Sequence, residues 1–81
     1  MYKNKSEIGL NNISGKKIAY YRMNRSEKTS QRKLADLMQM QGIDIDKNAI
    51  QRIEAGKRFI TDIELKVFAK VLDVDYKDLL D

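Results

Sequence analysis

Apolar residues recur along this 81-residue chain at the spacing of amphipathic helices, and no long stretch sustains the alternation of a β-strand. The clearest pattern lies in the C-terminal third, where apolar side chains occupy positions i, i+3, i+4 and i+7. These positions are Leu65, Phe68, Ala69 and Leu72. Such a face is typical of a helix packed against a core.

Two further helices are predicted in the middle of the chain. Ser30 has the chemistry of an N-cap residue. Leu34, Leu37 and Met38 follow it as a stripe at i, i+3 and i+4, which indicates one buried helix face. Gly42 is expected to end this helix.

The next helix is predicted to begin after Asp46, with Ile50 and Ile53 pointing to the core. Gly56 suits the left-handed position that follows many helices. Between the two helices, residues 43–46 alternate briefly between isoleucine and aspartate. We interpret this segment as a turn that buries one isoleucine, not as a lone strand.

A first helix is predicted to run to about Arg25, with Ile18 and Tyr21 facing inward at i and i+3. Either Ser14 or Asn12 is its candidate N-cap, because both side chains can accept a hydrogen bond from the first helical turn. The polar segment before it lacks helical periodicity. We therefore expect residues 1–12 to be a flexible arm and residues 13–81 to be the folded domain.

The C-terminal amphipathic helix has a start signal of its own. Thr61 is followed three residues later by Glu64, the spacing of a capping box. Asp75 is the expected cap of a last short helix that carries Leu79 and Leu80. The predicted fold is thus all-α, a compact domain of five helices.

Composition narrows the range of functions. The chain has no Cys and no His, so it lacks thiolate ligands, the usual general base and the commonest metal ligand. We expect no enzymatic activity, no cofactor and no metal. No apolar run approaches the roughly 20 residues that span a bilayer. We expect no membrane association and a cytoplasmic, nucleoid-associated location.

Charge is distributed unevenly along the chain. Residues 1–58 contain 13 Lys and Arg against 6 Asp and Glu, whereas residues 59–81 contain 3 against 6. This asymmetry is consistent with one surface that binds a polyanion. An ordinary charged surface explains the numbers equally well, so the charge alone does not decide between them.

The helix expected after Asp46 carries a polar face made by Lys47, Asn48, Gln51 and Arg52. Amide and guanidinium groups on an exposed helix can enter the major groove of DNA and read base edges. A solvated helix face is the alternative explanation. For Gln51 we leave open whether the side chain faces the bases.

Four stretches of the chain together match one known pattern. They are Gly-Lys-Lys-Ile at 15–18 with Arg22, SQRKLA at 30–35, AIQRIEAGKR at 49–58, and LKVFAKVLDV at 65–74 with Leu79-Leu80. In this order they resemble the phage repressor, Cro and Xre type of helix-turn-helix regulators, over about residues 14–80. The resemblance implies a five-helix, lambda-repressor-like domain whose third helix lies in the major groove.

The resemblance also implies roles for individual residues. Base contacts are expected from the third helix, at Lys47, Asn48, Ala49 and Arg52. Contacts to the DNA backbone are expected from Gln31, Lys57 and Arg58. An ion pair between Arg22 and Glu54 is expected to orient the first and third helices relative to one another.

The chemistry of these side chains suits the implied roles. Asn pairs with adenine, Arg or Lys pairs with guanine, and an Ala methyl can contact the methyl of thymine. A good bidentate pair gives about 1–3 kcal/mol of discrimination between bases.

The sequence departs from the family pattern in two places. Thr29 stands where Leu is typical, in a connector that is longer than usual. The stretch from Met38 to Asp46 is about five residues longer than the common tight turn, so we expect an enlarged turn that extends the second helix or changes the docking angle.

The sequence therefore predicts a double-stranded DNA-binding transcriptional regulator, a repressor, that acts as a homodimer on an inverted-repeat operator. The candidates for the dimer surface are Tyr76, Leu79 and Leu80 or the acidic C-terminal helix. One alternative is a helical protein-interaction module, such as an antitoxin or accessory factor, with an exposed apolar patch around Met38, Met40, Ile43 and Ile45. Another is that the chain is the DNA-binding part of a longer regulator.

Overall fold

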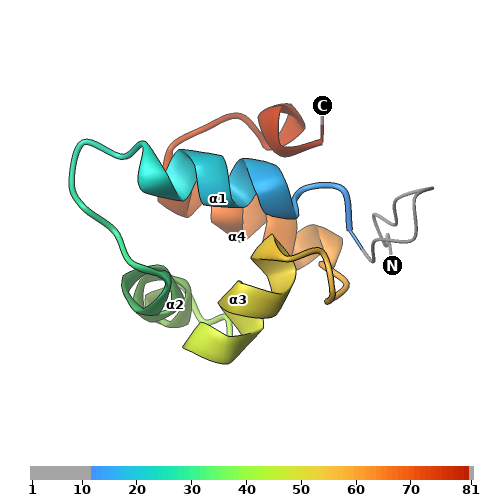
Figure 1. Ribbon diagram of the computed structural model, residues 1–81, viewed down its shortest axis with the longest axis horizontal. Helices are drawn as coiled ribbons and strands as arrows, with labels where there is room; N and C mark the ends of the chain where they lie inside the picture. Colours follow the sequence, from blue (N-terminus) through green and yellow to red (C-terminus); the bar gives the residue numbers. More distant parts are fainter. Residues whose placement is uncertain (1–11, 81) are drawn as a thin grey trace.

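A computed structural model describes residues 12–80 as a bundle of helices around one apolar core (Figure 1). The described elements are, in order, α1 (Gly15–Met23), α2 (Gln31–Met40), α3 (Lys47–Glu54), α4 (Asp62–Leu72) and the 3-10 helix η1 (Tyr76–Leu79). The all-α prediction is confirmed. The predicted arm, apart from Asn12, lies outside the described residues.

The packing places α3 against both α1 and α2, while α4 lies against α1, α2 and η1 (Figure 1). The core is built from the apolar faces that the sequence predicts. Its largest fully buried side chains include Phe68, Ile18, Leu34, Met38, Ile50, Ile53, Leu65 and Leu79. Because both α1 and α2 pack against α3, its inner face is held in place and its outer face is open to solvent.

Three predicted N-caps are confirmed. The side chain of Ser30 accepts a hydrogen bond from the backbone N–H of Lys33 at 3.0 Å. The carboxylate of Asp46 accepts one from the N–H of Ala49 at 2.8 Å. At α4, Thr61 and Glu64 form a complete capping box, which satisfies N–H groups that the first helical turn leaves without partners.

The C-terminal ends of α2 and α3 share one geometry. Gly42 (φ 85°) and Gly56 (φ 77°) both adopt the left-handed conformation, which glycine enters without strain. The residue after each glycine donates a hydrogen bond to a carbonyl in the last turn of the helix. The N–H of Lys57 donates to the carbonyl of Arg52 at 2.8 Å, and the N–H of Ile43 donates to the carbonyl of Met38 at 3.1 Å. These are the bonds of a Schellman motif.

One helix boundary differs from the prediction, and the structure gives the type of the last helix. α1 ends at Met23, not near Arg25, because both the backbone N–H and the side-chain amide of Asn24 donate to the carbonyl of Tyr20 and close the helix there. The predicted last short helix is a 3-10 turn of four residues. One turn is sufficient, because it already brings Leu79 into the core.

The connection between α2 and α3 is enlarged, as the sequence predicts. α2 continues to Met40, and residues 41–46 form the loop before α3. Within this loop Ile45 is buried and Ile43 is half-buried, so the loop is a turn that buries one isoleucine. The side-chain amide of Gln39 donates to the carbonyl of Ile45 at 2.8 Å and ties the loop to the end of α2.

Candidate nucleic-acid interface

The outer face of α3 carries most of the predicted base-contacting residues. Lys47, Asn48 and Arg52 are all exposed, and no hydrogen bond or ion pair joins their side chains to another residue within 12–80. Ala49 is placed differently, because it is half-buried and packs against the core. The three polar side chains are therefore available for a ligand, whereas the Ala49 methyl is partly covered by the protein.

The structure brings Arg22 and Glu54 together across α1 and α3. The Nε of Arg22 lies 2.7 Å from one carboxylate oxygen of Glu54, and a second guanidinium nitrogen donates to the other oxygen at 2.9 Å. The two side chains are only 13% and 8% exposed. A bidentate pair of this kind fixes angle as well as distance, so it sets the orientation of the last turn of α3 relative to α1.

Gln31 joins the same pair from α2. Its side-chain amide donates to a carboxylate oxygen of Glu54 at 3.0 Å. Arg22 also donates to the carbonyl of Thr29 at 3.1 Å, just before α2 begins. One carboxylate on α3 is thus held by groups from both neighbouring helices. The Gln31 amide has a structural role here, and its expected contact with the DNA backbone stays a prediction.

The two basic residues after α3 differ in their surroundings. Lys57 is exposed, whereas Arg58 is half-buried. The guanidinium of Arg58 donates to both carboxylate oxygens of Glu64, each at 3.1 Å. Arg58 therefore reaches the candidate interface with its charge already paired, and its contact with DNA backbone stays a prediction.

The carboxylate of Glu64 is shaped by these contacts. Burial by itself would raise the pKa of Glu64. The hydrogen bonds from Arg58 and from the backbone and hydroxyl of Thr61, together with the charge of Arg58, outweigh burial and lower the pKa below 4.5. Glu64 is therefore ionised at neutral pH and holds Arg58 as an ion pair.

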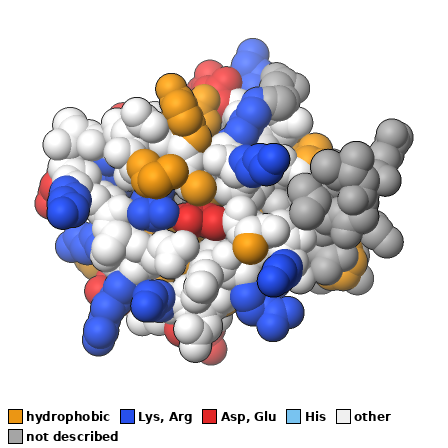
Figure 2. Space-filling model, in the orientation of Figure 1, with side chains coloured by type: hydrophobic (Ala, Val, Ile, Leu, Met, Phe, Trp, Pro, Cys, Tyr) orange, Lys and Arg blue, Asp and Glu red, His pale blue; other side chains and the backbone are white. Residues whose placement is uncertain are grey.

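A shallow hollow lies on the outer face of α3 and the residues just after it. Its volume is about 320 Å³, and its lining residues are Asn48, Gln51, Arg52, Ala55 and Lys57. Among these, Asn48 and Arg52 were expected to contact bases, and Lys57 was expected to contact the DNA backbone. On the face that carries α3, Lys and Arg side chains lie in several groups, and acidic side chains are visible near its centre and at its edges (Figure 2).

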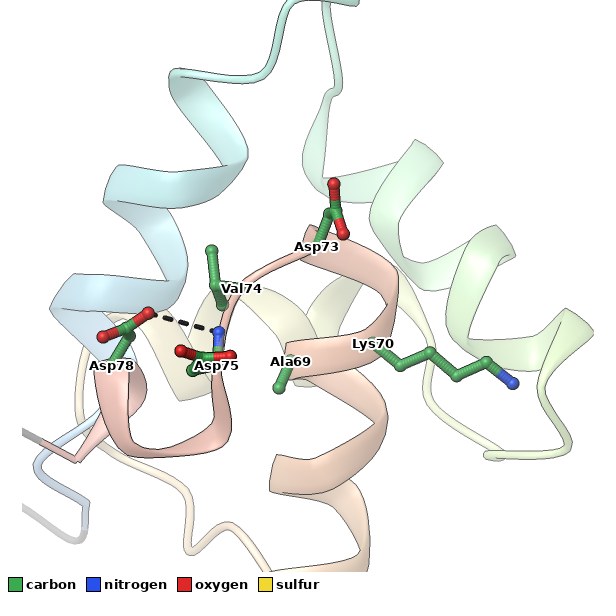
Figure 3. Close-up of a pocket in the computed structure, with 6 residues that line it drawn as sticks. All are labelled: Ala69, Lys70, Asp73, Val74, Asp75 and Asp78. Atoms are coloured by element: carbon green, nitrogen blue, oxygen red, sulfur yellow. Dashed lines mark hydrogen bonds between the residues drawn. The ribbon is translucent and has the colours of Figure 1, made fainter.

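A second hollow lies between α4 and η1, with a volume of about 440 Å³ (Figure 3). Asp73, Asp75 and Asp78 line it, and one Asp78 oxygen accepts a hydrogen bond from the backbone N–H of Asp75 at 3.2 Å. The side chain of Lys70 extends away from these carboxylates (Figure 3). Within residues 12–80 no group of acidic side chains is arranged to hold a metal ion. The negative charge of this second hollow is unsuited to binding a phosphate backbone.

The sequence predicted Asn12 only as a possible cap of the first helix and did not reveal its contacts with the end of α3. Its side chain is buried, accepts a hydrogen bond from the N–H of Gly15 at 2.6 Å, and donates to the carbonyls of Ile53 at 3.1 Å and Arg58 at 2.8 Å. Asn12 therefore caps α1 and fastens it to the end of α3. The residue belongs to the packed domain. Only its capping chemistry was visible in the sequence.

Comparison with solved structures supports the architecture. The chain is similar to the crystal structure of the restriction-modification controller protein C.AhdI from Aeromonas hydrophila, with a TM-score of 0.67 and 23% sequence identity. The match covers 80% of this chain and 84% of that one. The fold is that of a helix-turn-helix domain. No protein-family model matches the chain, and no curated protein matches it.

Within this fold, α2 and α3 are the two helices of the motif and the loop at 41–46 is its turn. A typical turn in this motif has about three or four residues, so the enlargement is a property of this chain. No helix within residues 12–80 is long and apolar enough to cross a membrane.

Proposed function

We propose that this protein is a sequence-specific double-stranded DNA-binding transcriptional regulator that reads the major groove with α3. The observation that carries the proposal is the contrast between the two sides of this helix. Its inner side is fixed by buried Ile50 and Ile53 and by the Arg22–Glu54 pair. Its outer side presents polar groups that form no bond with the described part of the protein.

This contrast matches the physical requirement for base readout. A side chain that discriminates between bases must reach the groove from a backbone that does not shift, because hydrogen bonds lose strength with small changes in angle and distance. The rigidity of α3 comes from both neighbouring helices. The chemistry of Lys47, Asn48 and Arg52 then supplies donors and acceptors for base edges.

The C.AhdI structure adds support from architecture, since that protein is a restriction-modification controller. We propose a regulatory and non-enzymatic role for the present chain, with repression as the mode and the cytoplasm as the location. We also propose that it binds as a homodimer to an inverted repeat. Dimers of this kind place two recognition helices about 34 Å apart, which is one turn of B-DNA.

The interaction-module alternative gains little from the structure. The expected apolar patch included Met38 and Ile45, but both are buried in the core. Met40 is 78% exposed, and Ile43 is half-buried. An exposed methionine beside a partly covered isoleucine is far smaller than the patches that mark protein interfaces.

The test is selection of bound duplexes from a random library, at low and at near-physiological salt. We expect a palindromic consensus that survives the higher salt. A triple variant, Lys47→Ala with Asn48→Ala and Arg52→Ala, should lose the site preference and keep its helicity. The matched control, Lys66→Ala with Lys70→Ala, removes two exposed cations from α4 and should keep the consensus. Binding that disappears as salt rises, with nothing enriched, would mean counterion release alone and would reject the proposal.

A further inference from the structure

Gln51 lies on the outer face of α3, within the arc that runs from Lys47 to Arg52. Residues along an α-helix advance by about 100° each, so Gln51 lies about 40° from Lys47 and about 60° from Asn48 around the helix axis. It is exposed. The same angles place half-buried Ala49 about 160° from Gln51, on the side of α3 that faces the core. A duplex that meets Lys47 and Asn48 therefore meets Gln51 between them.

The amide of Gln51 has no hydrogen-bond partner among the described residues. Gln31 donates to Glu54 and Gln39 donates to the carbonyl of Ile45, so both have structural roles. No side-chain hydrogen bond joins Gln51 to another residue within 12–80. Within the described residues, the Gln51 amide thus keeps its donor and its acceptor unpaired.

The hollow described above gives this amide a place in which to work. Gln51 is one of its lining residues, beside Asn48 and Arg52. Ala55, one helical turn after Gln51, contributes only a methyl group, which leaves space between the longer side chains. The hollow therefore combines two side-chain amides, those of Asn48 and Gln51, with a small apolar surface and flanking cations on a single exposed face.

We propose that Gln51 determines specificity for an A·T base pair, an inference that rests on the function proposed above. The Gln51 amide donates to N7 of adenine through its NH₂ group and accepts from N6 through its carbonyl oxygen, which is the bidentate pairing suited to this base. The Ala55 methyl provides an apolar contact for a thymine methyl in the same hollow. Lys57 lies at the rim, where it meets phosphate.

The experiment is a change of base preference. Wild type and Gln51→Arg are each put through library selection at near-physiological salt, and the base preferences are compared at every position. Arg pairs with N7 and O6 of guanine, so one position in each half-site should change from adenine to guanine. Gln51→Ala should lose roughly tenfold or more of the discrimination at that same position and keep the rest of the consensus.

Gln41→Arg is the matched control, since Gln41 is exposed at the end of α2 and the substitution adds the same charge. It should raise affinity at low salt without changing any preferred base. Ala55→Met tests the hollow itself, because the longer side chain fills it and should weaken the preference at the position that Gln51 reads. Circular dichroism and thermal unfolding establish that each variant is folded.

The outcomes separate the two proposals. A wild-type protein that enriches no consensus would reject DNA sequence recognition altogether. A wild-type consensus that Gln51→Arg and Gln51→Ala both leave unchanged would reject the role of Gln51 and leave the proposed function standing. A change at a position where the wild type does not prefer adenine would reject the adenine assignment.

Discussion

Gly15, at the start of α1, lies directly against the backbone carbonyl of Ile53 on α3. A Cβ atom built on Gly15 would overlap the Ile53 oxygen and would also lie 2.9 Å from the side-chain oxygen of Asn12. Both neighbours are held in place, the Ile53 oxygen by the backbone and the Asn12 side chain by its hydrogen bonds. The close approach of α1 and α3 therefore depends on the absence of a side chain at this position.

Gly15→Ala should lower the free energy of unfolding by about 1–3 kcal/mol, the usual range for overpacking. The helices must separate, because a backbone carbonyl cannot move aside as a flexible side chain can. Urea denaturation measures the loss. Lys16→Ala, at the adjacent exposed position, is the control and should be close to neutral. Equal stability of the two variants would show that α1 and α3 approach less closely than described.

Glu54→Gln should destabilise the protein by roughly 3 kcal/mol, because it leaves the guanidinium of Arg22 in a largely buried place without its counter-charge. DNA affinity should fall as well, since α3 loses the bond that sets its orientation. Urea denaturation and a binding titration against the selected duplex measure the two effects. Glu27→Gln changes the same charge at an exposed site and serves as control. If Glu54→Gln altered neither property, the pair would have no orienting role.

Stability should depend on the ionisation of Glu64. The pKa of this carboxyl is lower in the folded protein than its ordinary value of 4.5, so the folded state favours the charged form. Its contribution is complete above the ordinary value and is lost as the pH falls through the lower folded-state pKa. Glu64→Gln keeps an acceptor for the capping box but has no charge to titrate.

The free energy of unfolding of wild type and Glu64→Gln, followed from pH 7 to pH 3, tests this prediction. The advantage of the wild type at neutral pH should shrink as the solution becomes acidic. Arg58→Ala should reduce the same pH dependence, because Arg58 supplies the bonds that favour the carboxylate. A constant difference between the curves would contradict the assignment.

Asp73→Gly should stabilise the protein. Asp73 adopts φ 58° at the end of α4, a left-handed conformation that is strained for residues other than glycine. Its charge also lies at the negative end of the helix dipole. The expected gain is about 1 kcal/mol, or about 4–8 °C in Tm for a domain of this size. Asp75 has an ordinary φ of −71°, so Asp75→Gly relieves no strain and should instead lower Tm. Differential scanning calorimetry of both variants measures the two shifts in Tm.

The parts of the structure that the sequence predicted are governed by local physics. The caps at Ser30, Asp46 and Thr61 each involve a backbone N–H only three residues away, so residue type and spacing are enough to find them. The buried face of α4 follows from helical periodicity in the same way. Helix ends depend on competition between single hydrogen bonds, which is why the end of α1 was placed beyond Asn24.

The contacts that were missed connect distant parts of the chain. Asn12 bonds to carbonyls 41 and 46 residues away, and Arg25 donates to the carbonyl of Val71, also 46 residues away, at 2.7 Å. A polar side chain in a connector has no pattern that reveals such partners. The sequence also did not reveal that the Ala49 side chain points partly toward the core, because alanine fits a half-buried position as well as an exposed one.

The ion pair between Arg58 and Glu64 affects how a binding constant for a polyanion would depend on salt concentration. A cation that binds a phosphate releases condensed counterions, and each such contact steepens the fall of log Kobs with log[salt] by about 0.9. Arg58 is already neutralised by a carboxylate within the same molecule. In the function proposed above, pairing with Glu64 leaves Arg58 with less charge to exchange for counterions, so the affinity for duplexes should depend less steeply on ionic strength than the number of cations suggests.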